Sequence, residues 1–329
     1  MKKLLLTLLC PLLLIGGDTL TIAFWNVENL FDLEDDPRKN DEEFALGGKK
    51  GVTQKIYDLK LAHCAEVLAD LNADIVGLCE VENRFVLEEL NREFIGRNYD
   101  IVHFESPDRR GIDCALLYDA KILTVLDAKA IKNRMSTGKP TRDILYIKGE
   151  FESEVIHVFV NTGPSKYGGK EQAIPKRAET SLLLRKHVDE ILTADPSAEI
   201  VIIGDLNEGP LDDNVQSLLS RRAENPVFRL QNLMTPFMGK PNVGTYVYRG
   251  EDEIIDQIIV SRGLMQEEGL IVVEGSTAIL DMPKYRQQSG NYRHYPYRFW
   301  AGNKLLGGYS DHLAVKVAII RSDGRRGGK

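Results

Sequence analysis

Several apolar runs in this chain end in carboxylate or amide side chains, and this pattern restricts the possible folds more than any other feature. The run Ile200–Gly204 is followed by Asp205 and, two residues later, by Asn207. The runs that lead to Asn26 and to Glu80 end in the same way. Short apolar runs bounded by polar residues are typical of buried strands. The chain is therefore predicted to form a layered β-sheet domain whose polar groups gather at strand ends.

Predicted strands and helices alternate along the chain, which indicates an α/β or α+β fold in one domain over residues 18–320. Helical periodicity is expected over Lys55–Ala69 and Lys176–Leu192, and Pro175 suits the first turn of the second helix. The expected strands share short apolar or alternating patterns: Thr21–Asn26, Ile75–Val81, Asp113–Tyr118, Leu145–Phe151, Val155–Asn161, Ile200–Asp205, Ile254–Val260 and Ala314–Ile320. With 329 residues and 43% hydrophobic content, the chain can bury a large core.

The two ends of the chain differ from the predicted domain. Residues 1–17 have the features of an export signal, because Lys2 and Lys3 precede an apolar stretch that ends in small residues. That stretch is too short to span a membrane, so no stable membrane anchor is expected. The protein is expected to be exported, either to a periplasm or as a secreted protein. Residues 321–329 are basic and rich in glycine, which predicts a flexible tail.

Net charge and cysteine content narrow the functional classes. The formal net charge of −7 argues against a protein that binds nucleic acid through a uniformly basic surface. Loss of the export signal would remove two lysines and make the charge more negative. Cys64, Cys79 and Cys114 would remain, an odd number without metal-ligand spacing. Buried free thiols are expected rather than a disulfide framework.

Two polar segments are candidate loops, and one pair of basic residues is a candidate contact for a phosphate. Asp32–Lys50 is charged and is expected to be a long exposed loop. Asp281–Lys304 is polar and aromatic, and is expected to be a loop near the active face. Arg109 and Arg110 either contact a phosphate or form a solvated basic pair.

Alternation along a strand predicts which of these polar side chains share a face. Asn26 is expected to point the same way as Glu28, and Asp205 the same way as Asn207. By the same rule Glu80 and Glu82 share a face, with Cys79 and Val81 on the opposite face, towards the core.

These side chains form a set suited to metal-assisted hydrolysis of a phosphoester. Mg²⁺ takes oxygen ligands and keeps several waters, and Mn²⁺ is the alternative cation. The candidate metal ligands are Glu80, Glu28, Asn26 and Asp311.

The remaining polar groups suit the proton transfers and the charge stabilisation of such a reaction. Asp205 is predicted to hold and deprotonate the attacking water, and Asn207 to donate a hydrogen bond to that water or to a phosphate oxygen. His312, charged by its predicted partner Asp256, is expected to stabilise the pentavalent phosphorane.

Five motifs in order give the chain a family resemblance that spans about Thr21 to Ile320. They are Trp25-Asn26-Val27-Glu28-Asn29, Leu78-Cys79-Glu80-Val81-Glu82-Asn83, Gly204-Asp205-Leu206-Asn207, Ile255-Asp256-Gln257 and Tyr309-Ser310-Asp311-His312. The chain resembles the endonuclease/exonuclease/phosphatase superfamily, which has a deoxyribonuclease-I-like fold. The resemblance implies a four-layer sandwich of two β-sheets flanked by helices, with the site at one rim. It also implies Mg²⁺- or Mn²⁺-dependent hydrolysis of a phosphoester, with the site residues in the roles described above.

One position departs from the pattern of that family. Members often carry His or Tyr after the strand that ends here at Asn161, whereas this chain has Thr162, followed by Gly163-Pro164-Ser165. Thr162 and Ser165 are the candidate phosphate-binding residues there. Loss of one charged donor costs about 2.7–4 kcal/mol of transition-state stabilisation, which predicts a slower enzyme rather than an inactive one.

Three functions are compatible with this sequence. The first is an exported phosphodiesterase or phosphatase that acts by direct water attack. The second is a secreted nuclease acting on DNA or RNA, which the acidic charge disfavours. The third is a noncatalytic binding member of the same fold that lost its chemistry at Thr162.

Overall fold

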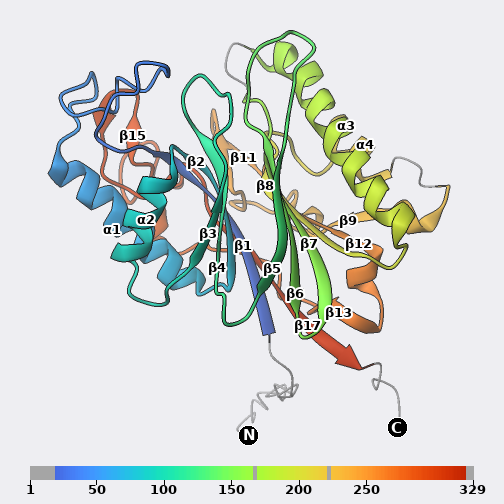
Figure 1. Ribbon diagram of the computed structural model, residues 1–329. Coiled ribbons are helices and arrows are strands. Elements are labelled where there is room, and N and C mark those ends of the chain that lie inside the picture. The colour runs from blue at the N-terminus through green and yellow to red at the C-terminus, as the bar shows by residue number, and fades with distance from the viewer. Residues whose placement is uncertain (1–18, 166–168, 221–223, 324–329) are drawn as a thin grey trace, which may run out of the picture.

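The computed structural model describes residues 19–165, 169–220 and 224–323, and in these ranges the chain forms a four-layer sandwich (Figure 1). Two β-sheets pack face to face. Helices α1 and α2 cover the outer face of one sheet, and α3 and α4 cover the outer face of the other. The prediction of an α/β fold with two packed sheets flanked by helices is therefore confirmed.

The first sheet has the strand order β13-β17-β1-β2-β4-β3, and β14 also pairs with β17. Its strands are β1 (Thr19–Leu30), β2 (Ile75–Val81), β3 (Asp100–His103), β4 (Asp113–Tyr118), β13 (Glu268–Val272), β14 (Ala278–Ile279) and β17 (Val315–Asp323). The second sheet has the order β5-β6-β7-β8-β12-β9. Its strands are β5 (Thr124–Ile131), β6 (Ile144–Phe151), β7 (Glu154–Thr162), β8 (Glu199–Asp205), β9 (Leu230–Asn232) and β12 (Asp256–Ser261).

Two small hairpins and the helices complete the described residues. The hairpins are β10 (Tyr246–Tyr248) with β11 (Glu251–Glu253), and β15 (Trp300–Ala301) with β16 (Lys304–Leu305). The α-helices are α1 (Gln54–Leu71), α2 (Arg84–Glu93), α3 (Lys170–Ala194) and α4 (Asp213–Ser220). None of the helices in the described ranges is both long and apolar enough to cross a membrane.

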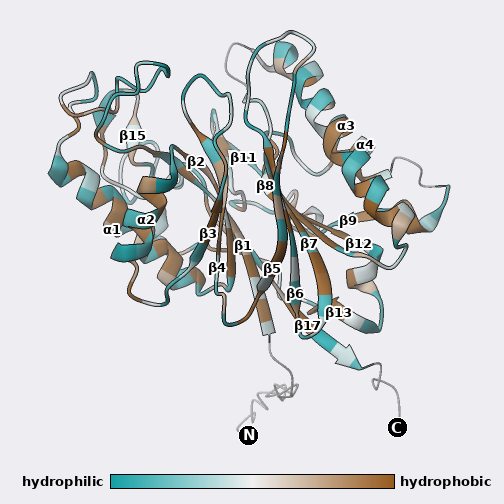
Figure 2. Cartoon of the chain, viewed as in Figure 1, coloured by the Kyte–Doolittle hydropathy of each residue, from teal (hydrophilic) through white to brown (hydrophobic). Residues whose placement is uncertain are grey.

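Three apolar cores hold the four layers together. The largest lies between the sheets and joins side chains such as Phe24 of β1 and Ile203 of β8. A second lies between the first sheet and helices α1 and α2, and a third lies between the second sheet and α3. Figure 2 shows the apolar strands in the interior and a polar outer side on each helix. Burial on both faces explains why central strands such as β2 and β8 have almost continuous apolar sequences.

The structure shifts several predicted element boundaries. β2 and β4 have the predicted bounds, and the other expected strands are present with shifted ends. Pro175 lies in the second turn of α3 because that helix begins at Lys170, so its predicted position in the first turn is wrong. The predicted flexible tail also begins too early. Arg321 pairs with Leu270 of β13, and the sheet continues to Asp323. Residues 1–17 and 324–329 lie outside the described residues.

Parts of the segment Asp32–Lys50 are buried, so the prediction of an exposed loop is wrong for them. Phe44 is 8% exposed and stacks on Phe31 with ring centroids 4.2 Å apart. Asp41 is 1% exposed. The prediction for the cysteines is confirmed, because all three in the described ranges are buried and free.

Candidate active site

The predicted site residues come from strand ends that meet at one rim of the sandwich, away from the end of β17 (Figure 1). β1 and β2 are parallel, and Asn26 lies opposite Cys79 near the ends of both strands. β12 runs antiparallel to β8, so Asp256 at the start of β12 lies opposite Asp205 at the end of β8. The chain directions explain why an acidic residue at the start of a strand reaches the same rim as one at the end.

A bulge in β2 sets the direction of Glu80. Cys79 pairs with Cys114 and Val81 pairs with Asp113, which leaves Glu80 as an extra residue with φ of 62°. Such a left-handed conformation is costly for a residue other than glycine, and bulges often redirect a side chain next to a site. The carboxylate of Glu80 accepts a hydrogen bond from the amide of Asn29 at 3.2 Å, which holds it beside the end of β1.

Because of the bulge, the prediction that Cys79 and Val81 share one face of β2 is wrong. Cys79 lies in the core between the sheets, whereas Val81 lies in the core under α1 and α2. They therefore do not share a face. Glu82 accepts a hydrogen bond from the amide of Asp32 at 2.6 Å, which turns it toward the segment that follows β1. Strict alternation fails here because the extra residue shifts every side chain after it.

Asp205 lies in a network of amide donors at the centre of the rim. Its Oδ2 accepts hydrogen bonds from Nδ2 of Asn26 at 3.2 Å and from Nδ2 of Asn207 at 3.1 Å. Its Oδ1 accepts one from the backbone amide of Asn207 at 2.9 Å. Asn207 has a φ of 55° and also donates to the carbonyl of Gly163 at 3.1 Å. The two hydrogen bonds that the side-chain amide of Asn207 donates thus orient the carboxylate of Asp205 and hold the loop after β7.

His312 and Asp256 form a buried pair across the two sheets, as the sequence predicts. Nδ1 of His312 lies 2.8 Å from Oδ2 of Asp256, which is 0% exposed. The hydroxyl of Ser310 accepts from the amide of His312 at 3.0 Å and donates to the carbonyl of Asn26 at 2.7 Å. The ring of Tyr246 lies against the imidazole with centroids 4.8 Å apart. These contacts fix the imidazole on the rim next to Asp205.

Burial and mutual charge shift the pKa values of these groups. Burial, with the charges of Asp256 and Glu80, raises the pKa of Asp205 to about 7, although His312 opposes the shift. Burial alone would lower the pKa of His312, but Asp256 and then Asp205 raise it well above its usual value. A ligand atom from each of Asp205, Asp256 and His312 lies within 4.8 Å of the others. A metal ion bound by His312 would have to displace the proton that this raised pKa favours.

Glu28 belongs to a second charged group on the same rim. Its carboxylate accepts hydrogen bonds from the amides of Phe299 at 2.7 Å and Trp300 at 2.9 Å. Arg298 forms an ion pair with Asp311 and lies 4.0 Å from Glu28. The segment Asp281–Lys304 thus reaches the candidate site, as expected from its composition. Arg298 itself was not predicted, because a single arginine in a long aromatic loop carries no recognisable signal.

The residue types at this rim are those that a hard divalent cation takes as ligands. Glu28, Glu80 and Asp311 bring carboxylates to the rim and Asn26 adds an amide, although Glu28 and Glu80 already accept hydrogen bonds from backbone amides and Asp311 is paired with Arg298. Burial and the charge of Asp311 raise the pKa of Glu28 to about 8, although Lys60 and Arg298 oppose the shift. A divalent cation would remove the repulsion that contributes to this shift, and an oxygen-rich donor set is the kind that Mg²⁺ and Mn²⁺ prefer.

These shifts predict that metal binding releases protons. Without metal, Glu28, with its pKa of about 8, is mostly protonated at pH 7. A bound cation favours the ionised carboxylates, so we expect release of about one proton per ion at pH 7 and almost none at pH 9.5. Calorimetry of Mn²⁺ binding in buffers of different ionisation enthalpy measures this number. The prediction is wrong if binding at pH 7 has no buffer dependence.

The same shifts predict how stability depends on pH in the absence of metal. A carboxyl with a raised folded-state pKa binds more protons when folded than when unfolded. The free energy of unfolding should therefore fall as pH rises from about 4.5 to about 8, the interval between the usual and the raised pKa of Glu28.

Two buried arginines hold the loop that carries the predicted phosphate-binding residues. Nη2 of Arg142 donates to the carbonyl of Gly163 at 2.8 Å, and Nη1 of Arg177 donates to the carbonyl of Pro164 at 3.3 Å. Thr162 is 4% exposed and pairs with Asp205 in the parallel register of β7 and β8, while Ser165 is exposed. The guanidinium of Arg142 therefore lies against Gly163, the residue that follows Thr162. Arg142 lies just before β6, in a stretch whose sequence has no distinguishing pattern, so the sequence did not identify it as a site residue.

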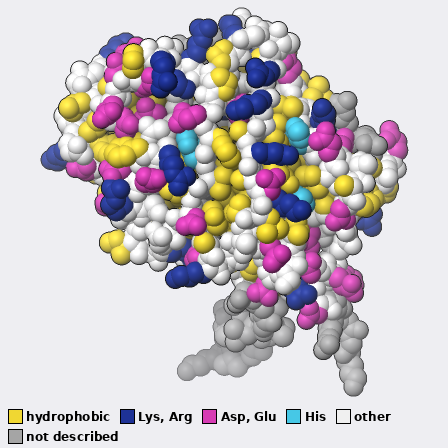
Figure 3. Space-filling view, in the orientation of Figure 1, with side chains coloured by type: hydrophobic (Ala, Val, Ile, Leu, Met, Phe, Trp, Pro, Cys, Tyr) yellow, Lys and Arg dark blue, Asp and Glu magenta, His cyan; other side chains and the backbone are white. Residues whose placement is uncertain are grey.

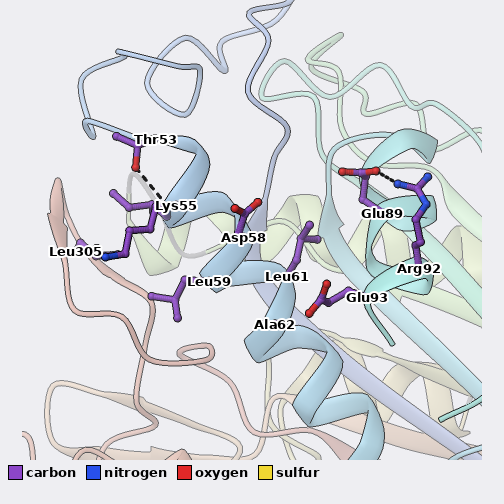
Figure 4. A pocket seen from close by; sticks show the side chains of 11 residues that line it. Thr53, Lys55, Asp58, Leu59, Leu61, Ala62, Glu89, Arg92, Glu93 and Leu305 are labelled. Carbon is purple, nitrogen blue, oxygen red and sulfur yellow. Dashed lines mark hydrogen bonds and ion pairs between the residues drawn. The ribbon is translucent and has the colours of Figure 1, made fainter. Parts of the chain in front are cut away.

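The groove shown in Figure 4 is separate from this rim. It has a volume of about 810 Å³ and lies between α1, α2 and the β16 hairpin, with Leu59, Glu89 and Leu305 among its lining residues. Its lining contains none of the predicted site residues. The strand-end rim, and not this groove, is therefore the candidate active site.

A family model for the endonuclease/exonuclease/phosphatase family matches residues 21–321. The chain belongs to the endonuclease/exonuclease/phosphatase family. The match covers all five motifs, so the family resemblance predicted from them is confirmed. Members of this superfamily hydrolyse phosphoester bonds. No curated protein matches the chain.

Solved structures of low sequence identity share the family fold. Humanized TDP2 from D. rerio matches with a TM-score of 0.58 and 14% identity, covering 92% of this chain and 98% of that one. The catalytic domain of human Nocturnin matches with a TM-score of 0.56 and 16% identity, covering 92% and 97%. A family protein from Bacteroides thetaiotaomicron matches with a TM-score of 0.58 and 16% identity, covering 93% and 99%. At these identities the likeness concerns the fold alone.

Proposed function

We propose that this chain is a divalent-metal-dependent phosphoesterase that uses direct attack by water. The observation that carries the proposal is the pair of His312 and Asp256 beside Asp205 on a buried, oxygen-rich rim. Family membership supports a hydrolase of phosphoester bonds. The three groups divide proton transfer and charge stabilisation between them in a way that such hydrolysis requires.

Asp205 is proposed as the general base. Its two oxygens accept three hydrogen bonds from Asn26 and Asn207, which orients the carboxylate toward one position. With a pKa of about 7, Asp205 can take a proton from water at neutral pH and release it afterwards. The water oxygen then forms its bond to phosphorus as the ester oxygen leaves. Asn207 acts here mainly by orienting Asp205, and its contact with a phosphate oxygen remains a proposal.

His312 is proposed to stabilise the negative charge that develops on the phosphoryl oxygens. Asp256 accepts a hydrogen bond from Nδ1 of the charged ring, and Nε2–H, which lies 4.0 Å from Oδ1 of Asp311, is proposed to face substrate. Hydrogen-bond donors that are fixed in a buried site need little reorganisation during the reaction. Each contributes about 2.7–4 kcal/mol of transition-state stabilisation. The cation, held by Glu80 with Asn26, Glu28 and Asp311, would supply Lewis-acid stabilisation of a phosphoryl oxygen. Arg142 is a buried cation that donates to the carbonyl of Gly163, next to Thr162, and Ser165 is exposed.

Small phosphodiesters or phosphomonoesters are the proposed substrate class. Basic and acidic side chains are interspersed over the face shown in Figure 3, and the net charge of the chain is −7. Such a surface gives little nonspecific attraction for duplex DNA. A nuclease is the second candidate, because a structure of D. rerio TDP2 with a single-strand DNA product is among the similar folds. Export of the protein through residues 1–17 remains a proposal, which detection of the mature chain outside the cytoplasm would test.

A substrate and metal panel tests the proposed function. The purified protein is assayed with bis-p-nitrophenyl phosphate, p-nitrophenyl phosphate, plasmid DNA and single-stranded DNA, each with Mg²⁺, Mn²⁺ or excess chelator. We expect turnover of a small ester that depends on metal and stops with chelator. Faster turnover of DNA with a steep salt dependence would favour the nuclease. Binding of metal without turnover of any substrate would favour the noncatalytic alternative.

A further inference from the structure

Three side chains of metal-ligand type converge outside the catalytic rim, where β3 is joined to β4. His103 ends β3, Asp113 begins β4, and Glu105 lies in the loop between them. One ligand atom from each of the three lies within 4.8 Å of the others. Nε2 of His103 lies 3.2 Å from Oδ2 of Asp113, and these two side chains are 3% and 1% exposed. Glu105 is exposed, so the cluster can be reached from solvent.

The spacing and the chemistry of this cluster fit a tetrahedral ion. Zinc bonds of about 2.0–2.2 Å to nitrogen and oxygen place neighbouring ligand atoms about 3.4 Å apart. His103 and Asp113 form a hydrogen bond with each other at 3.2 Å, so their ligand atoms already lie close to this spacing. One imidazole and two carboxylates suit Zn²⁺ better than Mg²⁺, which prefers oxygen ligands alone. Three protein ligands leave a fourth position for water.

The residue whose backbone amide binds the same carboxylate carries a buried hydroxyl without a partner among the described residues. The amide of Ser106 donates to Oδ1 of Asp113 at 2.9 Å. Ser106 is 6% exposed, and its hydroxyl oxygen has no hydrogen-bond partner among the described residues. A buried hydroxyl without a partner is costly, and a water bound to a cation is one group that could satisfy it. This observation is independent of the spacing of the three ligands.

The surrounding charge favours a cation. Glu105 lines a pocket of about 700 Å³ whose wall carries six carboxylates and two basic side chains, Arg38 and Lys39. Arg38 is paired with Asp36, and Nζ of Lys39 donates to the carbonyls of Ser106 at 3.2 Å and Asp108 at 3.3 Å. The pocket that Glu105 lines is therefore acidic, which favours the approach of a cation to this carboxylate.

We propose that His103, Glu105 and Asp113 bind a Zn²⁺ ion that fastens the 104–112 loop to strand β4. That loop carries Asp108, whose Oδ2 lies 3.1 Å from Nη1 of Arg142. Arg142 in turn holds the carbonyl of Gly163 beside Asn207. The ion thus stabilises one side of the catalytic rim without taking part in the reaction.

Zinc binding to the metal-stripped, full-length protein tests this proposal. Calorimetry in excess Mg²⁺, which occupies the oxygen-rich rim, should give one equivalent of Zn²⁺ for the wild type. Loss of a residue that only hydrogen-bonds a metal ligand weakens metal binding by up to about 100-fold. Glu105→Gln and His103→Gln each remove a ligand itself, so each should weaken zinc binding by more than that. Glu34→Gln is the matched control, because Glu34 is exposed on the wall of the same pocket and should leave binding unchanged. Glu80→Gln should also retain the zinc equivalent.

Stability and spectroscopy provide two further measurements. Zinc at 100 times its Kd should lower the unfolding constant of the wild type about 100-fold and leave that of Glu105→Gln unchanged. Co²⁺ at this site should give the strong visible absorption of a tetrahedral ion, which His103→Gln should lose. If His103→Gln does not fold, Glu105→Gln carries the test because its side chain is exposed. The proposal is overturned if the wild type binds no zinc, or if Glu80→Gln abolishes binding while Glu105→Gln does not.

Discussion

Glu80→Gln is expected to reduce kcat/KM on the order of 10³-fold, whereas Glu82→Gln should change it less than about threefold. The loss corresponds to the several kcal/mol that a metal ion contributes to transition-state stabilisation. The two residues are of the same type and only two positions apart, so they form a closely matched pair. Steady-state kinetics on the preferred small ester at several Mg²⁺ concentrations measures both effects.

The bulge in β2 is the physical reason for this contrast. Glu80, with its φ of 62°, points to the rim where its charge reaches Asp205, while Glu82 holds the amide of Asp32. Glutamine can accept that amide hydrogen bond, so Glu82→Gln should fold normally. Glu80→Gln should also raise the Mg²⁺ concentration needed for half-maximal activity, which a purely structural defect would not do. Equal losses in the two variants, or a larger loss in Glu82→Gln, would contradict the assignment of Glu80.

The regular strands were predictable because their signal is local. β2 and β4 have the predicted bounds, since each is a short apolar run between polar residues. Short strands such as β9 and β10 depend on partners distant in sequence and carry no periodic signal of their own. α2 had a usable signal that was overlooked. Asn83 caps its first turn through Val86, and Leu87 and Leu90 are buried on one side.

The candidate site was predictable in residue identity but not in geometry. The motifs identify Asp205, Asp256 and His312, which the structure brings together. The direction of the Glu80 side chain was not predictable. A left-handed backbone conformation is usually indicated in a sequence by glycine, and the bulge has glutamate at this position. The position of Arg298 depends on the path of a long loop whose contacts with Glu28 are tertiary. Sequence reasoning thus identifies the chemical groups, and packing determines how they face one another.

His312→Gln and Asp205→Asn are each expected to lower kcat/KM by about 10²–10⁴-fold, the usual contribution of one acid or base group. His157→Gln is the control for loss of an imidazole, because His157 bonds Tyr146 on β6, away from the site motifs. Asp256→Asn should also lower kcat/KM, since it removes the carboxylate that keeps His312 charged. If His312 and Asp256 act as one unit, the double variant should be about as slow as the slower single variant.

The pH profile distinguishes these roles from a general loss of structure. Wild-type kcat/KM should rise with pH as Asp205, with its pKa of about 7, loses its proton. It should fall at higher pH as His312 loses its proton, because its pKa is raised well above the usual value. Asp256→Asn removes the main cause of that raised pKa, so the descending limb should move to lower pH. An unmoved descending limb in Asp256→Asn, with normal folding, would show that the charge of His312 does not control the reaction.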